Sequence, residues 1–350
     1  MTGVQTCALP ISPGASALER PGIVAAGNPP PAPLNPGEAV RIMTGAPLPA
    51  GAEAVVPVEQ AQRQGGRVVF SAAPAAGAHL RRRGDSIAAG ASLLTPGLPL
   101  TPGRIALAAL AGADPIAVYR KPRIGIAVTG NELVAPSEIP GPGQIRDSNG
   151  PMLVALSRSR RLDPKLLPRV SDDSAGLARL FEEAAGSELD VLLTSGGVSA
   201  GDFDLLPAEA SRQGFAMLFH SVAVRPGKPI AFGRRESLLW FGLPGNPVSA
   251  AVCFHVFVRH ALDRLEGTAR PGPERVTALL THEARQGARE SFRDAILSAD
   301  KGSNRVELLA TAGSHDLAAH GRANALARIP AGDGRISAGA EVECILLERG

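Results

Sequence analysis

Aromatic residues are scarce in this chain, at 3% of 350 positions, with a single Trp and a single Tyr. So few aromatic side chains argue against a surface on which nucleic-acid bases stack. The formal net charge of +3 comes without a long basic block, so nucleic acid is not an expected partner. Apolar runs stay below the ~18 residues of a membrane span, so no membrane partner is expected either.

Cysteine is equally rare. The three cysteines, Cys7, Cys253 and Cys344, lie far apart and match neither a metal-binding nor a disulfide spacing. The seven histidines are scattered and form no zinc triad. The chain is therefore expected to work in a reducing compartment, and we predict a cytoplasmic location.

What is present indicates a globular protein of two or three domains, because 44% of the residues are hydrophobic and 20% are charged. The 40 glycines and 31 prolines predict many turns and several small β modules. Residues 1–12, MTGVQTCALPIS, look like a translated sequencing adapter, so we expect a non-native leader and a missing native N-terminus. This segment is excluded from the fold prediction.

The remaining chain divides by its pattern of strands and helices. Residues 13–90 carry short β runs between turn signals, which predicts a small β-rich domain lacking its N-terminal part. Residues 91–120 contain a short helix and predict a linker-domain remnant. Residues 121–268 alternate strands with helices, and residues 269–350 return to short strands that predict a β-barrel-like domain.

The alternation over residues 121–268 predicts a doubly wound parallel sheet, so the fold class is α/β with flanking all-β modules. Ligands bind such sheets at the carboxyl ends of the strands. Asn149 is expected to cap the helix that follows it. Unusual loops follow the predicted strands at residues 129–132, 194–204, 225–229 and 242–247.

One of these loops follows an apolar strand at residues 191–194 and reads Ser195-Gly196-Gly197, with Asp202 and Asp204 soon after. Glycines let the backbone amides approach a phosphate closely. Two aspartates so near each other suit Mg²⁺ held together with substrate phosphates. The alternative interpretation of this stretch is a surface turn with solvated acids.

Two further features suit anions. Arg81, Arg82 and Arg83 are able to clamp phosphates, or alternatively form a solvated charge cluster. Asn246 and Pro247 are typical of a helix N-terminus, which attracts anions through its amides and dipole. The alternative there is an ordinary strand-to-helix connection.

Six segments in one order carry a family resemblance: RIMTGAPLPAGAEAVV, RRRGDSI, VTGNEL, TSGGVSAGD, RPGKP and GLPGNPVSA. Together they make residues 21–350 similar to the molybdopterin molybdenumtransferases, which are related to the C-terminal domain of gephyrin. The resemblance implies that adenylyl-molybdopterin is cleaved with Mg²⁺, that molybdate supplies molybdenum and that AMP leaves. It also implies a homodimer with its site between subunits, an α/β domain like that of the molybdopterin adenylyltransferases, and such an adenylyltransferase as a possible partner.

Residue roles follow from the resemblance. It makes Glu132, Asp202 and Asp204 catalytic carboxylates and Mg²⁺ ligands. Thr44 and Arg81 are expected to reach the other subunit's site. The remaining substrate-binding residues are Ser195, Gly196, Gly197, Ser199, Pro244, Gly245, Asn246 and Pro247. The molybdate-binding residues are Arg225, Lys228, Ser249, Arg293 and Ser314.

The chain departs from the family pattern at three places. The family's GED after the arginines is Gly84-Asp85-Ser86 here, which shifts or loses one acid. Asn131 stands where the family has an aspartate, which leaves one carboxylate in that motif. The family's DNSAMDGYA-type segment has no counterpart, so we expect a truncated chain with impaired activity. Two alternatives remain: an adenylyltransferase or pyrophosphatase on the same core, and a non-catalytic, gephyrin-like scaffold. The additional β domains and the basic pair in RPGKP favour the transferase.

The metal role of Asp204 is testable by the Asp204→Asn substitution. The change removes a charged oxygen ligand but keeps the side-chain volume, so turnover is expected to be abolished while the fold stays intact. AMP release and circular dichroism measure the two properties. Full activity in this variant would refute the metal role.

Overall fold

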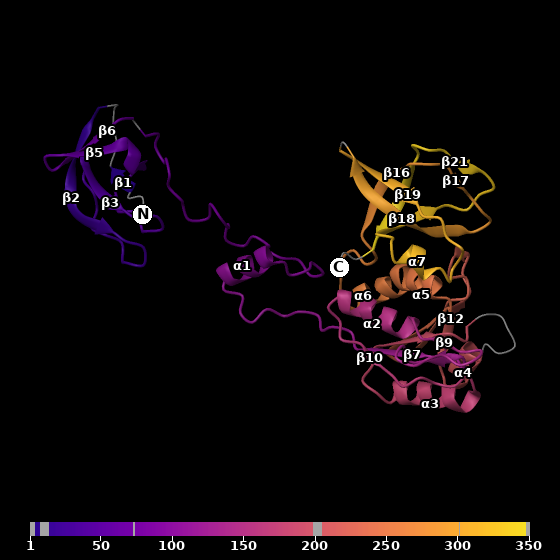
Figure 1. The fold of residues 1–350 in the computed structure, drawn as a ribbon. Helices are drawn as coiled ribbons and strands as arrows, with labels where there is room; N and C mark the ends of the chain where they lie inside the picture. Colours follow the sequence, from indigo (N-terminus) through magenta and orange to yellow (C-terminus); the bar gives the residue numbers. More distant parts are fainter. Residues whose placement is uncertain (1–3, 8–13, 73, 199–204, 301, 348–350) are drawn as a thin grey trace. The chain divides into compact units, whose positions relative to one another are not determined.

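The structure, a computed structural model, describes residues 4–7, 14–72, 74–198, 205–300 and 302–347 (Figure 1). The chain forms two compact units, residues 1–92 and residues 93–350. Among the described helices, none has the length and apolar content needed to cross a bilayer.

The first unit is built on a six-stranded sheet, in the order β4-β1-β3-β2-β6-β5. Apolar side chains of these strands are buried in two clusters, one containing Val56 and Phe70 and the other containing Val40 and Ile42. Three of its strands, β3 (Glu38–Ile42), β4 (Ala54–Pro57) and β6 (Arg67–Phe70), match β runs predicted from the sequence. The other strands are β1 (Val4–Cys7), β2 (Ser16–Val24) and β5 (Ala61–Gln64), with a 3-10 turn at Val58–Gln60.

Strand β1 lies inside the segment that the sequence analysis excluded from the fold. It pairs antiparallel with both β3 and β4, from Val4 opposite Ile42 to Cys7 opposite Ala39. The backbone of residues 4–7 thus joins β4, the edge strand, to β3. The structure therefore includes part of residues 1–12 in the sheet.

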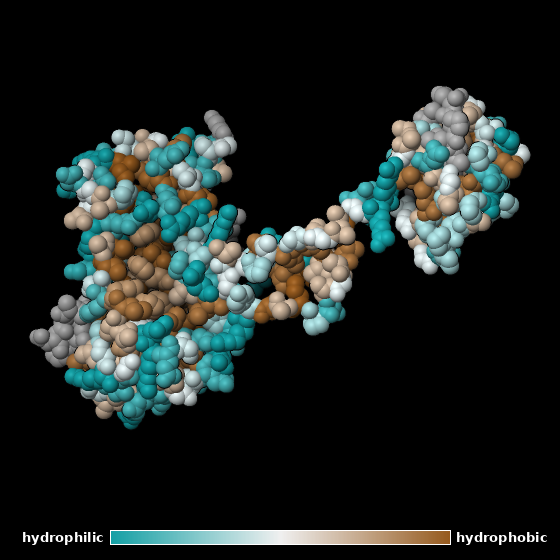
Figure 2. Space-filling view, turned by 180° about the vertical axis from the view of Figure 1, so that it is seen from behind, coloured by the Kyte–Doolittle hydropathy of each residue, from teal (hydrophilic) through white to brown (hydrophobic). Residues whose placement is uncertain are grey.

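The linker segment carries α1 (Pro102–Leu110), which Thr101 caps by accepting a hydrogen bond from the backbone N–H of Arg104. A helix at this place, with Pro near its start, agrees with the prediction. Ala108 is its only buried residue, whereas Ile105 is 54% and Leu110 is 72% exposed. Apolar side chains accordingly show on the surface of this segment (Figure 2).

The α/β domain has a six-stranded sheet in the order β10-β7-β11-β15-β14-β12. Five strands run in the same direction, but β14 runs antiparallel to its neighbours β15 and β12, so the sheet is mixed and not wholly parallel as predicted. The reason is a tight hairpin at Glu236, which joins β14 directly to β15 without a crossover helix. The strands are β7 (Ile124–Val128), β10 (Lys165–Leu166), β11 (Val191–Ser195), β12 (Ala216–His220), β14 (Ala231–Arg235) and β15 (Leu238–Leu243).

Helices cover both faces of this sheet (Figure 1). On one face α3 (Ser174–Ala185) and α4 (Leu206–Arg212) pack around Phe181 and Trp240, whose rings meet edge to face at 5.3 Å. On the other lie α2 (Asn149–Ser159) and a helical segment over residues 247–265. That segment is one helix as predicted, but it contains a π-helical stretch between α5 (Pro247–Cys253) and α6 (Arg259–Leu265).

The C-terminal strands close into a barrel, because β18 pairs with both β19 and β20. Small side chains such as Ala295, Ala325 and Ala327 fill its interior. The barrel strands are β16 (Arg275–Leu280), β18 (Glu290–Asp300), β19 (Ser303–Leu308), β20 (Ala325–Ile329) and β22 (Glu341–Leu346). The predicted β-barrel-like architecture agrees with this arrangement.

A short strand from the α/β domain extends the barrel sheet. Strand β13 (Val224–Arg225) runs parallel to β18, with Val224 opposite Glu290 and Arg225 opposite Ser291. The sequence predicted residues 216–224 as one strand, whereas the chain leaves the α/β sheet at His220 and joins the barrel sheet at Val224. A shared apolar core, with Val252 and Phe292 at its centre, lies beneath this crossing.

The start of the α/β domain depends on Asp190, a buried carboxylate. Arg120 donates to it from both terminal nitrogens, at 2.5 and 2.6 Å, and the backbone N–H of Arg123 donates at 2.8 Å. The hydrogen bonds from Arg120 are the largest cause that lowers the pKa of Asp190. The carboxylate therefore contributes stability above its unfolded pKa of about 3.9, and this contribution is lost as pH falls through the lower folded pKa.

We predict that Asp190→Ala lowers the free energy of unfolding at pH 7 by about 2 kcal/mol, the usual size for hydrogen bonds to a charged group. Urea unfolding from pH 7 to pH 3 measures this effect, and the difference from wild type should shrink at the acid end. Glu188→Gln is the matched control, because the Glu188 side chain is 85% exposed and its ion pair with Arg123 is at the surface. Equal losses in the two variants would contradict the assignment.

Candidate functional site

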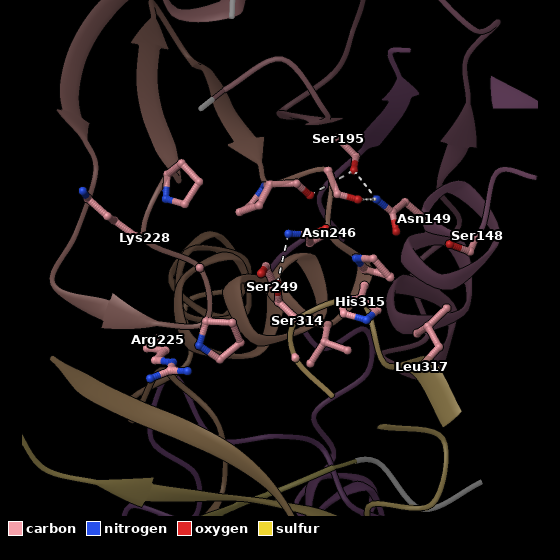
Figure 3. A pocket seen from close by; sticks show the side chains of 18 of the residues that line it. Ser148, Asn149, Ser195, Arg225, Lys228, Asn246, Ser249, Ser314, His315 and Leu317 are labelled. Atoms are coloured by element: carbon pink, nitrogen blue, oxygen red, sulfur yellow. Dashed lines mark hydrogen bonds between the residues drawn. The ribbon is translucent and has the colours of Figure 1, made fainter. Parts of the chain in front are cut away.

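A cavity of about 1510 Å³ lies at the carboxyl ends of the parallel strands, between the α/β domain and the barrel (Figure 3). Loops after β7, β11 and β15 form its floor, and β18 closes it from the barrel side. This is where a doubly wound sheet is expected to bind ligands. Many of the predicted site residues line it: Glu132, Ser195, Gly196, Gly197, Arg225, Lys228, Pro244, Gly245, Asn246, Pro247, Ser249, Arg293 and Ser314.

The floor of the pocket is bare backbone because glycine is required there. Gly196 has φ of +103°, and a Cβ on it would lie 2.6 Å from the carbonyl oxygen of Thr129. Gly197 also has a positive φ, of +59°. A side chain at either position would strain the turn, so the loop presents main-chain atoms to the cavity.

Asn149 ties this floor to the neighbouring loop. Its Nδ2 donates to Ser195 Oγ and to the carbonyl oxygen of Gly245, both at 2.7 Å. Ser195 Oγ in turn donates to the carbonyl oxygen of Pro244 at 3.4 Å. Asn149 was predicted as the cap of α2, but it is the first helical residue, and Asp147 instead accepts from the N–H of Gly150 at 2.9 Å. The Asn149 side chain is directed to the two loops and away from its own helix.

The opposite side of the pocket is cationic. Arg225 ends β13, Lys228 follows it in the same loop, and Arg293 projects from β18. Burial and then the charge of Arg225 lower the pKa of the Arg293 guanidinium, although an arginine keeps its proton in proteins. Among the ion pairs of the described residues, none involves these cations. The arrangement therefore favours an anion.

Two serines and an amide lie near the cations. Ser249 is 4% exposed in the first turn of the helical segment 247–265. Asn246 donates to Ser314 Oγ at 3.0 Å, and the N–H of Val248 donates to the carbonyl oxygen of Ser314 at 3.1 Å. The barrel loop that carries Ser314 is thus fixed to the start of this helix. Hydroxyls beside cations at a helix N-terminus suit an oxyanion.

Three family models match the chain. The MoeA N-terminal region (domain I and II) matches residues 7–112, the probable molybdopterin binding domain matches residues 125–264, and the MoeA C-terminal region (domain IV) matches residues 277–347. The molybdopterin molybdenumtransferase of Nostoc sp. is 33% identical over 338 residues, which are 94% of this chain and 77% of that protein.

This chain belongs to the molybdopterin molybdenumtransferase family.

Two further relatives agree. The molybdopterin molybdenumtransferase of Bacillus subtilis is 40% identical over 65% of this chain and 53% of its own length, so the chain spans about half of that relative. A crystal structure of a molybdopterin biosynthesis moeA protein from Pyrococcus horikosii has a TM-score of 0.77 and 28% identity, covering 99% of this chain and 88% of that one. The family and the fold inferred from the six sequence segments are confirmed.

The predicted carboxylates are only partly placed. Glu132 lines the cavity with an exposed side chain. Its carboxylate lies close to Gly130, since a Cβ added to Gly130 would be 2.8 Å from the carboxylate oxygens. Ser199, Asp202 and Asp204 lie outside the described residues. The described residues contain no group of three acids, histidines or cysteines able to hold a metal. A single carboxylate still suits Mg²⁺, which is commonly held by one or two carboxylates together with substrate phosphates.

Two predicted residues belong to the first unit. Thr44 is exposed in the turn after β3, and Arg81 is exposed in the loop beyond β6. Their role at the site of a second subunit stays a prediction.

The sequence analysis missed several pocket residues. Asp172, predicted only as part of a helix cap, lines the pocket, as do Asp147, Arg289 and His315. Arg289 donates to the carbonyl oxygen of Val224 at 3.2 Å and so supports the strand before Arg225. The sequence signal for Asp147 was its place in the loop before α2, which lies at the same sheet edge as the motifs already recognised.

The basic loop depends on Gly227, which allows a further test. Gly227 has φ of +109°, and a Cβ there would lie 2.6 Å from Cys253 Sγ. We predict that Gly227→Ala lowers the free energy of unfolding by about 3 kcal/mol, from backbone strain and overpacking together. In a Cys253→Ala background, the same Gly227→Ala change should lower the free energy of unfolding by a smaller amount, because the sulfur that the new Cβ would meet is gone.

Gly302→Ala is the control for this test. Gly302 has φ of +85° with no neighbour within 4 Å of a Cβ, so only the backbone term of about 1 kcal/mol is expected. Thermal and urea unfolding measure all the variants. Similar losses at the two glycines would show that the contact with Cys253 does not matter.

Proposed function

We propose that this chain inserts molybdenum from molybdate into adenylyl-molybdopterin with release of AMP. The observation that carries the proposal is the division of one pocket into two chemically different sides. One side has three cations that form no ion pair with any described residue, and the other presents bare backbone and a buried amide (Figure 3). A substrate with a neutral ring and a chain of anionic groups is complementary to such a pocket.

Molybdate is a tetrahedral dianion, and the cationic side offers what it requires. Arg225, Lys228 and Arg293 supply charge, and the hydroxyls of Ser249 and Ser314 supply short hydrogen bonds. The charge repulsion between Arg225 and Arg293 is relieved when a dianion lies between them. These residues would therefore bind and orient the molybdate and exclude competing water.

The pyrophosphate of the adenylylated substrate is expected near Ser195, Gly196 and Glu132. Backbone amides of the glycine turn would point at its oxygens, and Glu132 would hold Mg²⁺ with the loop that contains Asp202 and Asp204. A bound Mg²⁺ would neutralise charge that develops as the phosphate bond breaks. Glu132 and the turn would fix the geometry of that bond relative to the molybdate side.

The barrel favours this function over an adenylyltransferase or a pyrophosphatase. Arg293 and Ser314 come from the barrel and line the same cavity as the α/β loops. An enzyme that only transfers or cleaves an adenylyl group has no evident need for a second anion site. The homodimer, the adenylyltransferase partner and the cytoplasmic location stay predictions from the resemblance and the composition.

The decisive experiment incubates the chain with adenylyl-molybdopterin, Mg²⁺ and varied molybdate, and follows AMP release. Release should depend on molybdate, and Lys228→Ala should raise the half-saturating molybdate concentration by at least about tenfold, the effect of removing one charged contact. Lys165→Ala, an exposed change on β10 outside the pocket, is the control.

Each other outcome selects an alternative. AMP release that is independent of molybdate indicates a pyrophosphatase. Formation of adenylyl-molybdopterin from ATP and molybdopterin, with no molybdate-dependent step, indicates an adenylyltransferase. Binding without any turnover indicates a scaffold.

A further inference from the structure

Asn149 carries a hydrogen-bond acceptor that no described residue meets. The residue is 6% exposed and lines the pocket, yet its Oδ1 is buried without a hydrogen-bond partner among the described residues. Buried polar atoms in folded proteins nearly always have a partner, so an exception at a pocket wall points to a ligand.

The orientation of this amide is fixed by its neighbours. The carbonyl oxygen of Gly245 only accepts hydrogen bonds, so the nitrogen of the Asn149 amide must face it at 2.7 Å. The second N–H is used by Ser195 Oγ, also at 2.7 Å, because that hydroxyl donates its own proton to Pro244. Both donors are therefore occupied. Oδ1 is left as a rigid acceptor that cannot turn away to find water or another partner.

The place of Asn149 in the pocket and the chemistry of its Oδ1 limit the ligand groups that can bind there. Figure 3 shows Asn149 on the opposite side of the view from Arg225 and Lys228. Asn149 Oδ1 only accepts hydrogen bonds and does not pair with the oxygens of an anion, so the ligand group that meets it must carry a hydrogen-bond donor. O–H and N–H groups both meet this requirement, and the N–H groups of a planar heterocycle are donors of this kind.

We propose that Asn149 Oδ1 accepts a hydrogen bond from an N–H of the pterin ring and thereby determines substrate specificity. This inference rests on the proposed function, which supplies a pterin as the substrate. The pterin ring offers two such donors, the ring amide and the exocyclic amine. Recognition by a rigid acceptor discriminates strongly, because a ligand without the donor leaves Oδ1 unpaired in a buried site.

The test compares three probes by fluorescence titration: 6-hydroxymethylpterin, its 3-methyl derivative and its 2-dimethylamino derivative. The 3-methyl group removes the ring amide N–H, and the 2-dimethylamino group removes both N–H bonds of the exocyclic amine. The wild-type chain should bind the parent compound at least about tenfold more tightly than one of the derivatives, the factor for one unmet buried hydrogen bond. Asn149→Leu keeps the side-chain volume but has no acceptor. In this variant the difference for that derivative should fall to within about twofold.

Two further variants separate recognition from structural support. Ser195→Ala removes one partner of Nδ2 but leaves Oδ1 in place, so discrimination between the probes should remain. Asn324→Leu removes an amide that is fully used by Leu297, through bonds of 2.6 and 2.9 Å in the barrel. It should lower stability without changing discrimination.

A wild-type chain that binds all three probes equally overturns the inference, whether or not the Leu variant folds. So does an Asn149→Leu protein that discriminates as wild type does, since Asn149 would then only hold the two loops. If either of these results is found while AMP release still depends on molybdate, the inference about Asn149 is wrong and the proposed function stands. Absence of both pterin binding and molybdate-dependent AMP release removes the proposed function itself.

Discussion

The pairing of two residues, Val224 and Arg225, with strand β18 is the constraint on which the pocket depends. It draws a loop out of the α/β domain and fixes it to the barrel, over an apolar core that contains residues from both. Without this pairing Arg225 would not lie beside Arg293, and the cavity would have no wall on that side. A few backbone hydrogen bonds thus convert two adjacent domains into one binding site, and the buried side chains beneath them supply the stability that so short a strand lacks.

The resulting site has opposite requirements on its two sides. The side near Gly196 is made of close-packed backbone that admits no added methyl group, so its shape is fixed before any ligand arrives. The side near Arg225 and Lys228 consists of long, exposed cationic side chains that are able to adjust. A rigid surface suits recognition of a planar ring, whereas cationic side chains suit an anion whose charge changes during a reaction. The glycine-rich side of the pocket is therefore suited to binding the ring of a substrate, and the cationic side is suited to the reacting anion.

Local motifs explain how much of this was predictable from the sequence. The turn at Ser195 and the basic loop at Arg225 are each a short continuous stretch of sequence, so each is recognisable from sequence alone. The structure brings both to one cavity, as expected from the strand pattern. The antiparallel course of β14 was missed because an apolar run carries no sign of strand direction. The role of Asn149 was missed for a different reason. Its contacts join positions 46 and 96 residues away, and a helix-capping asparagine looks identical in sequence. Residues 4–7 were excluded by their composition, although backbone pairing in a sheet is open to almost any sequence.

The lowered pKa of Arg293 has a consequence for the protein as a whole. Burial and, after it, the nearby charge of Arg225 disfavour the charged Arg293 guanidinium, and a bound oxyanion would offset both effects. By mass action, an oxyanion that enters raises the free energy of unfolding of residues 93–350 with the logarithm of its concentration. The fold is thus least stable when its anion is scarce. A bound oxyanion is therefore expected to protect the chain from proteolysis, which acts on the unfolded fraction.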